Sequence, residues 1–190
     1  MRIVMCPSKS MSYLETYKER IRLCHELLKI PTNYELSHGL PLHMEANDLV
    51  PIENDVFDRP QKLISSAGKN WEKMKNAADS DGIFIKIVSA FRSVNYQVEV
   101  ITRKLDKGEN INSILEMIAA PGYSEHHTGR AIDLTTDNCA HLSESFEQTE
   151  AFVWLTKNAS QFSFSLTYPR NCKAKINFEP WHWVYNDKNT

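Results

Sequence analysis

The spacing of apolar residues along the chain predicts helices in its first part and short strands behind them. Residues 12–30 carry an apolar side chain every three or four positions, which is the period of a helix packed on one face. Ser12 and Glu15 form a capping-box pattern at its start, and Pro31 ends it because proline cannot continue a helix. We therefore expect an amphipathic helix over residues 12–30.

The next part of the chain is interrupted by prolines. Residues 31–60 are expected to form an extended, turn-rich arm, since Pro31, Pro41, Pro51 and Pro60 fix the backbone and interrupt both helix and sheet. After Pro60 the helical period returns and predicts a second helix with a mostly polar outer face. Its apolar stripe consists of Leu63, Ala67, Trp71, Met74 and Ala78.

The second half of the chain mixes both periods. Alternating isoleucines in IFIKIVS, residues 83–89, predict a strand. Short strands are also predicted for AIDL, FSFSLTY and WHWVY, and helices for residues 95–108, 113–122 and 150–160. The fold class that we expect is α+β, with a small, mainly antiparallel sheet, flanking helices and a helical N-terminal part. A chain of 190 residues suits one domain, so we expect a single unit over 1–190, with 1–40 as a helical extension of a core over 41–190.

Composition narrows the class of protein. Apolar residues make up 42% and charged residues 24%, as in ordinary globular chains. A formal net charge of −2 and a pI near 6.4 give no reason to expect a nucleic-acid partner. The N-terminal apolar run is too short for a signal peptide or a membrane span, so we expect a protein that is cytoplasmic as written, or periplasmic or extracellular if the chain is trimmed. We also expect a monomer. The cysteines form no CxxC pair and are expected to be free thiols: Cys6, Cys24, Cys139 and Cys172.

Two stretches, SEHHTGRAID (124–133) and EPWHWVY (179–185), carry residues suited to a catalytic metal. Catalytic zinc takes three protein ligands and keeps one open position. His126 and Asp133 can supply two of them, and the tail supplies Glu179 or His182. Because a proline follows Glu179, these two residues should lie on an extended segment or tight turn, where one binds metal and the other meets the water. A carboxylate that is not a ligand can act as general base, and Glu179 fits that role.

The neighbours of these residues are also informative. Gly129 permits a positive φ or a close backbone approach, and Ala131 keeps the site wall small. Successive residues of an extended chain point to opposite sides, so His127 is expected at the rim of the pocket while His126 binds metal.

Together these residues resemble the VanY-type zinc peptidases, the D-alanyl-D-alanine carboxypeptidases and their LD-carboxypeptidase relatives, which have the LAS-type zinc peptidase fold. The stretch SAFRSVNYQ, residues 89–97, is similar to the family's SGYRS segment, and NDLVPI, residues 47–52, is similar more weakly. The resemblance spans residues 40–185 and depends most on Ser124, His126, Gly129, Ala131, Asp133, Glu179, Trp181 and His182.

The resemblance implies a complete catalytic site. One zinc ion would be held by His126, Asp133 and His182, with Glu179 as general base. Arg92 would bind the terminal carboxylate of the substrate, since a guanidinium and a carboxylate form a bidentate pair. Ser124 and Gln97 are further candidates for hydrogen bonds to the substrate backbone. The implied substrate is a peptidoglycan stem peptide or muropeptide, which would lose a C-terminal D-alanine.

Rim positions depart from the family's commoner residues and leave the choice between DD and LD specificity open: Phe91, Tyr123, His127 and Val184. Two other functions remain alternatives. One is a non-catalytic, zinc-stabilised module that binds cell wall or a protein partner. The other is a serine-type DD-peptidase that uses Ser66 and Lys69 as an SxxK pair, with weaker matches at residues 93–95 and 127–129.

Overall fold

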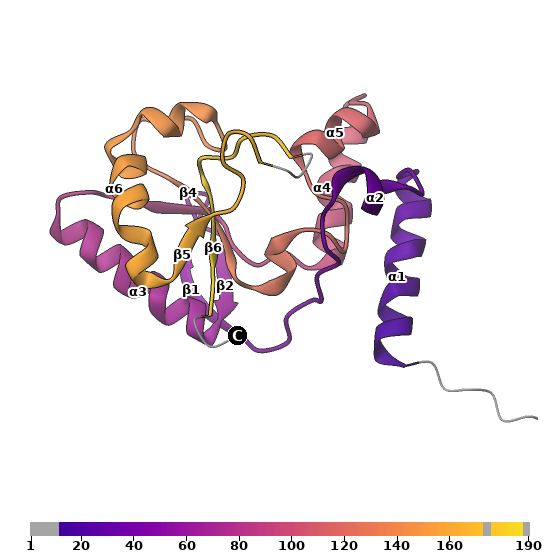
Figure 1. Cartoon of the computed structure of the whole chain (residues 1–190), viewed down its shortest axis with the longest axis horizontal. Helices are drawn as coiled ribbons and strands as arrows, with labels where there is room; N and C mark the ends of the chain where they lie inside the picture. Colours follow the sequence, from indigo (N-terminus) through magenta and orange to yellow (C-terminus); the bar gives the residue numbers. More distant parts are fainter. Residues whose placement is uncertain (1–11, 173–175, 188–190) are drawn as a thin grey trace, which may run out of the picture.

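A computed structural model describes residues 12–172 and 176–187 of the chain, and it contains two antiparallel sheets with helices around them (Figure 1). The smaller sheet is a hairpin of β1 (Leu49–Asn54) and β2 (Pro60–Ile64). The larger sheet has the order β3 (Lys86–Ser89), β4 (Ala131–Thr135), β6 (His182–Tyr185) and β5 (Phe164–Leu166). All neighbouring strands are antiparallel, which confirms the expected α+β class.

The helices lie in the N-terminal part of the chain and around the larger sheet. They are α1 (Tyr13–Leu28), α2 (Tyr34–His38), α3 (Ser65–Ser80), α4 (Val94–Asp106), α5 (Ile111–Met117) and α6 (Glu150–Asn158). Three 3₁₀ turns complete the set: η1 (Glu125–Thr128), η2 (Glu144–Gln148) and η3 (Ala159–Phe162). The predicted capping box of α1 is present, with the side chains of Ser12 and Glu15 each bonded to the other's backbone N–H. Over the described ranges, no helix has the length and apolar character needed to cross a membrane.

The arm over residues 31–60 differs from its prediction, because it contains both α2 and β1. Leu63 also belongs to β2 and not to the helix that follows, which begins at Ser65. In the hairpin, Leu63 pairs with Val50 and is fully buried. Leu63 and Ala67 are four residues apart, and four is a multiple of the strand period as well as close to one helical turn. The apolar stripe therefore ran across the boundary between a strand and a helix.

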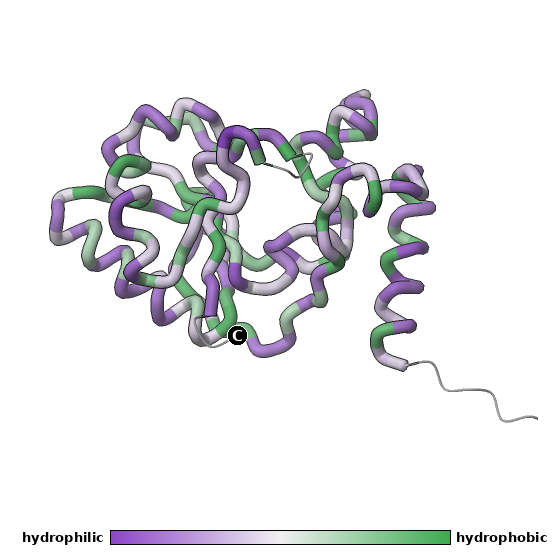
Figure 2. Tube along the Cα trace, viewed as in Figure 1, coloured by the Kyte–Doolittle hydropathy of each residue, from purple (hydrophilic) through white to green (hydrophobic). Residues whose placement is uncertain are grey.

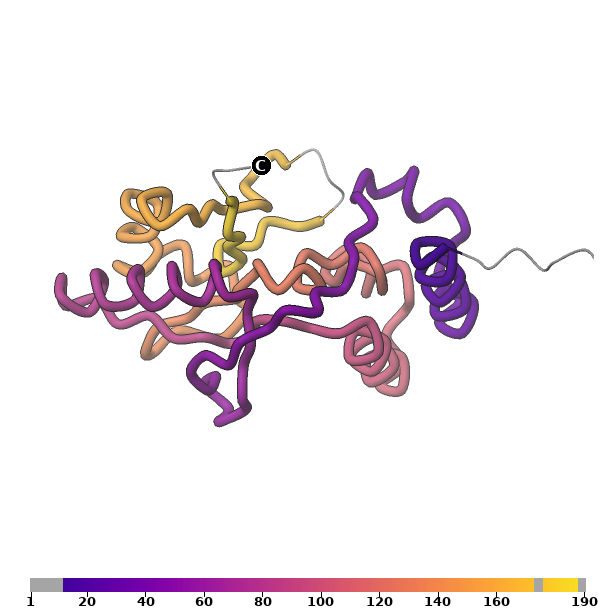
Figure 3. Tube along the Cα trace, turned by 90° about the horizontal axis from the view of Figure 1, so that it is seen from below, coloured from indigo at the N-terminus to yellow at the C-terminus, as the bar shows by residue number. Residues whose placement is uncertain are grey.

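Two hydrophobic clusters form the core. One packs α3 and α6 against the larger sheet, around Trp71, Ile132 and Phe164. The other joins α1 and α2 to α4 and α5, around Tyr34 and Ile101. Figure 2 shows apolar stretches along the central strands and mixed polar and apolar positions along α1. In Figures 1 and 3, α1 lies at the opposite end of the molecule from α3, so the N-terminal helices pack on the α4–α5 side and leave the sheet to other elements.

The N-terminal helices hold the segment that leads into SEHHTGRAID. The His25 ring donates from Nε2 to the Pro121 carbonyl at 2.8 Å, and the Ala120 N–H donates to the Tyr34 hydroxyl at 3.0 Å. Gly122 has φ +87°, and a Cβ at this position would lie 2.9 Å from Ile21 of α1. A glycine is thus required where the helix and the segment touch.

We predict that Gly122→Ala destabilises the protein more than Gly108→Ala does. Both glycines have φ above +80°, but a Cβ at Gly108 meets nothing within 4 Å. The left-handed backbone costs each alanine about 1–2 kcal/mol, and the clash with Ile21 adds about 1–3 kcal/mol to Gly122→Ala alone. Urea unfolding of both variants measures the difference. Equal losses of unfolding free energy would contradict a close contact between α1 and this segment.

Candidate metal centre

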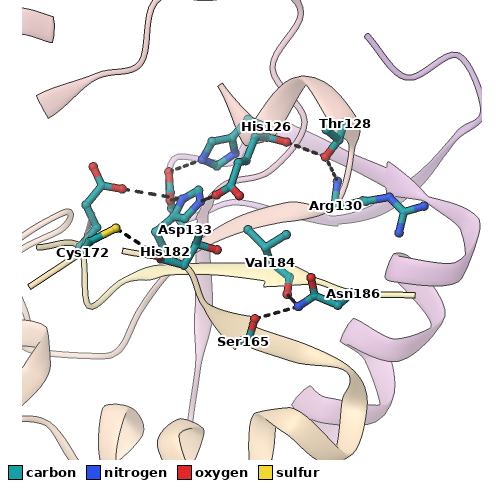
Figure 4. Close-up of polar contacts among 12 residues, drawn as sticks. His126, Thr128, Arg130, Asp133, Ser165, Cys172, His182, Val184 and Asn186 are labelled. Carbon is teal, nitrogen blue, oxygen red and sulfur yellow. Dashed lines mark hydrogen bonds and ion pairs between the residues drawn. The ribbon is translucent and has the colours of Figure 1, made fainter. Parts of the chain in front are cut away.

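Asp133 and His182 lie side by side because β4 and β6 pair them directly in register. The His182 Nδ1 atom is 2.9 Å from Asp133 Oδ1, and the Nε2 atom of His126, from η1, is 3.2 Å from Asp133 Oδ2. Figure 4 shows the three side chains pointing toward one another. One possible ligand atom from each lies within 4.8 Å of the other two, and all three residues are buried.

His126 has the environment of a metal ligand. Its Nδ1 donates to the Ala90 carbonyl at 2.6 Å, which leaves a lone pair on Nε2. Among the described residues this buried Nε2 atom finds no hydrogen-bond partner. Burial, aided by the charge of Arg92, lowers the pKa of His126 to about 4, so its imidazole is neutral at pH 7. A neutral imidazole, a second imidazole and a carboxylate form a donor set that zinc takes, so the three residues fit this metal.

His182 and Asp133 form a buried ion pair. Burial lowers the pKa of His182, but hydrogen bonds to Asp133 and Glu125 outweigh it and raise the pKa to about 10. Burial likewise disfavours the Asp133 carboxylate, but the adjacent His126 and His182 bring its pKa well below the usual range. A metal ion must therefore displace the proton from His182 Nδ1.

Glu179 lies in the tight turn before β6, as the proline after it suggested. Its carbonyl accepts from the His182 N–H at 3.0 Å, and its Oε2 atom is 3.8 Å from His182 Nδ1. Burial raises the pKa of Glu179 to about 7, against a smaller opposing effect of His182. A carboxyl group with this pKa can exchange a proton near neutral pH, which is what a general base requires.

A cavity of about 360 Å³ lies over these residues. Arg92 and Ser124 line it together with Glu179 and the His–Asp–His cluster. The Arg92 Nη2 atom is 3.7 Å from Asp133 Oδ2, and its Nε atom is buried with no hydrogen-bond partner in the described ranges. Gln97 is fully buried but does not line the cavity. Its amide nitrogen donates to the carbonyl of Ala119 at 2.7 Å, and Ala119 does line the cavity.

The expected rim position of His127 is wrong. Its side chain is fully buried, with Nδ1 donating to the Arg92 carbonyl at 2.6 Å and Nε2 accepting from the Gly122 N–H at 3.0 Å. The segment is a 3₁₀ turn, in which successive side chains differ by about 120° and do not alternate as they would in a strand. His126 therefore faces Asp133, whereas His127 supports the backbone of Arg92.

Two residues at the site were not identified from the sequence. The Glu125 Oε2 atom is 2.9 Å from His182 Nε2, and the Tyr168 ring centre is 5.0 Å from that of His182. Both line the cavity. Burial, and then the charges of Glu125 and Glu179, raise the pKa of Tyr168, so its hydroxyl stays protonated. Only the position of Glu125 next to His126 was a signal in the sequence.

Among the described residues, Lys69, Ser93 and His127 of the serine-type alternative line no common cavity. Lys69 lines a separate cleft beside Trp71 and Glu53, and the Ser93 hydroxyl caps α4 by accepting from the Tyr96 N–H. Both ring nitrogens of His127 are already hydrogen-bonded, Nδ1 to the Arg92 carbonyl and Nε2 to the Gly122 N–H. Of the cysteines, Cys24, Cys139 and Cys172 are half-buried free thiols, and Cys6 lies outside the described residues.

An α+β fold that presents a buried His–Asp–His cluster and a protonatable glutamate in one cavity is typical of a metal-dependent hydrolase. The family model described as VanY, D-alanyl-D-alanine carboxypeptidase, matches residues 60–188, and the chain belongs to this family.

Relatives and solved structures agree with this assignment. The chain is 33% identical over 159 residues to a protein named putative carboxypeptidase YodJ of Bacillus subtilis (strain 168), in a match that covers 80% of the chain and 58% of that protein. The chain thus spans a little over half the length of this relative. A structure of the LdcB LD-carboxypeptidase is 31% identical, with a TM-score of 0.68 over 78% of this chain and 72% of that one. A variant of the D,D-pentapeptidase VanY from a VanB-type resistance cassette, in complex with Zn(II), shares the fold at 24% identity, with a TM-score of 0.56 and 82% of each chain covered.

We predict that zinc binding weakens as the pH falls. Because the Nδ1 proton of His182 must leave when a metal binds, and its pKa is about 10, protons compete with zinc over the whole neutral range. Between pH 8 and pH 6 the Kd should rise at least about tenfold for each pH unit. Competition with a chromophoric chelator of known pH dependence measures it. A Kd that does not change with pH would contradict the protonation state of His182.

Proposed function

We propose that this protein is a zinc-dependent carboxypeptidase that removes a C-terminal D-alanine from peptidoglycan stem peptides. The observation that carries the proposal is the convergence, in one cavity, of the His–Asp–His cluster, of Glu179 with its raised pKa, and of Arg92, whose Nε atom has no partner in the described part of the chain. Membership of the VanY family and the similarity to LdcB support it.

His126, Asp133 and His182 would hold one zinc ion, which when bound supplies Lewis acidity and lowers the pKa of a water toward ~7. Glu179 would take a proton from the attacking water and give it to the departing amine, because its pKa of about 7 allows both transfers at neutral pH. The neutral state of His126 leaves its Nε2 available as a ligand.

Arg92 would make the enzyme specific for chain ends. Its guanidinium lines the cavity with a buried donor that has no partner among the described residues, and a terminal carboxylate satisfies such a donor in a charge-assisted bond. The backbone holds it in place, since the Arg92 N–H donates to the His126 carbonyl at 3.2 Å. Ser124, also in the cavity wall, is proposed as a hydrogen-bonding partner of the substrate backbone. Gln97 does not line the cavity, so its proposed contribution to substrate binding is indirect: it would hold the Ala119 carbonyl in the cavity wall.

The wall of the cavity is suited to a small apolar end group. The side chains that surround the polar residues are mostly apolar: Val100, Met117, Ile118, Leu142, Ile176 and Trp181. Methyl groups of D-alanine gain from contact with such a wall. A module that only binds its ligand, the other function considered, has no need of a protonatable glutamate beside the metal ligands.

Substitution of Glu179 tests the catalytic role directly. Glu179→Ala should retain one zinc per chain, since Glu179 is not among the proposed ligands. Hydrolysis of tetrapeptide or pentapeptide stems should fall about 10²- to 10⁴-fold in kcat, the usual contribution of a general base. Zinc content by atomic absorption and D-alanine release by an enzyme-coupled assay measure the two properties.

Glu99→Ala is the matched control, because Glu99 is an exposed glutamate of α4 and does not line the cavity. It should keep both zinc and activity. Full activity in Glu179→Ala would remove Glu179 from the mechanism. Wild-type protein that binds zinc but releases no D-alanine would favour the binding module instead.

A further inference from the structure

His182 is held by a carboxylate at each of its two ring nitrogens. Nδ1 lies 2.9 Å from Asp133 Oδ1, inside the candidate ligand cluster. Nε2 lies 2.9 Å from Glu125 Oε2, on the other side of the ring. The Glu125 side chain is only 17% exposed, so this second contact is made largely out of water.

The two histidines of the cluster use opposite ring nitrogens. His126 directs Nε2 to Asp133 and donates from Nδ1 to the Ala90 carbonyl at 2.6 Å. His182 directs Nδ1 to Asp133, and its Nε2 meets Glu125. A ring nitrogen can bind a metal only through a lone pair, and the hydrogen bond made by the other nitrogen determines which one keeps its proton. The acceptor behind His126 is thus the neutral Ala90 carbonyl, whereas the acceptor behind His182 is the charged Glu125 carboxylate.

We propose that Glu125 is the positioning residue of the metal centre: it holds the proton on His182 Nε2 and thereby directs the Nδ1 lone pair to the metal. This role rests on the proposed zinc site. A carboxylate behind a ligating histidine fixes the tautomer and orientation of the ring and increases the basicity of the ligand. Because Glu125 and His126 are adjacent in the chain, the same 3₁₀ turn supplies one proposed ligand, His126, and the carboxylate that positions another, His182.

The charges of the site are consistent with this role. Asp133, Glu125 and Glu179 contribute three negative charges when ionised, and Arg92 contributes one positive charge. A divalent cation would bring the total to zero in a buried site, where an unbalanced charge is costly. The position of the His182 ring beside Glu125 is also supported by Tyr168, whose ring packs on the His182 ring with 5.0 Å between the ring centres.

Zinc affinity of Glu125 variants tests the proposal without any use of catalysis. Glu125→Ala should bind zinc about 10- to 100-fold more weakly than the wild type, as is usual when such a carboxylate is removed. Glu125→Gln retains an oxygen that can accept from Nε2–H, and its loss should be smaller. Competition of the purified full chain with a chromophoric chelator gives the Kd values.

Glu53→Ala is the matched control. Glu53 is an exposed glutamate that also makes a side-chain hydrogen bond, since it accepts from the Trp71 indole N–H at 3.0 Å, but it lines a different cleft. Its removal should change stability without changing zinc affinity. An equal loss of zinc affinity in Glu53→Ala would overturn the proposal, because it would show that loss of stability alone weakens metal binding.

A spectroscopic measurement reports the tautomer itself. In long-range ¹H–¹⁵N spectra of the zinc-loaded wild type, His182 should show a protonated Nε2 and a metal-bound Nδ1. In Glu125→Ala this signature should be lost or broadened, and Glu125→Gln should restore it. The same signature in Glu125→Ala as in the wild type would overturn the proposal.

Two other outcomes would also decide against it. Unchanged zinc affinity in Glu125→Ala would remove Glu125 from the metal centre. If that variant also had a raised KM, Glu125 would belong to substrate binding. These failures are distinct from failure of the proposed function, which would appear as a wild-type protein that binds no zinc or releases no D-alanine.

Discussion

The pairing of β4 with β6 determines the candidate metal centre, because it sets Asp133 opposite His182 across two antiparallel strands. A shift of one residue in this register would move one of the two side chains to the other face of the sheet. The register is fixed by residues that flank the pair, since Ile132 and Trp183, opposite each other, are buried in the core under α3 and α6. The chemistry of the site and the packing of the sheet are thus set by the same strands.

The remaining groups reach this pair through loops, and the second hydrophobic cluster holds those loops in place. The segment before Ser124 is bonded to α1 and α2, and His127 connects Gly122 to the carbonyl of Arg92. The cavity is lined both by residues of the larger sheet, such as Asp133 and His182, and by residues of α4 and α5, such as Val100 and Met117. The helices α1 and α2 therefore support the side of the site where the substrate would bind, although none of their described residues lines the cavity.

The sequence was sufficient for the fold class and for the candidate ligands, because both depend on short, local patterns. AIDL and WHWVY were predicted as short strands, and Asp133 and His182 lie in them. Contacts between residues that are far apart in the sequence could not be predicted from such patterns. Leu63 was assigned to a helix because its spacing to Ala67 suits either period, and only the pairing with β1 decides between them. His127 was placed at the rim because an extended chain was assumed where the structure has a 3₁₀ turn. Glu125 was missed since its function appears only when His182, far along the chain, lies against it.

The most direct test of the account is mass spectrometry of tetrapeptide and pentapeptide muropeptides after incubation with the protein, with and without a chelator. The protein should remove one terminal alanine from at least one of the two substrates, and none once zinc has been removed. Restored cleavage on addition of zinc, in wild-type protein but not in His182→Ala, would assign the reaction to the cluster described above. Cleavage that persists in the presence of chelator, or intact substrates with a zinc-loaded protein, would contradict it.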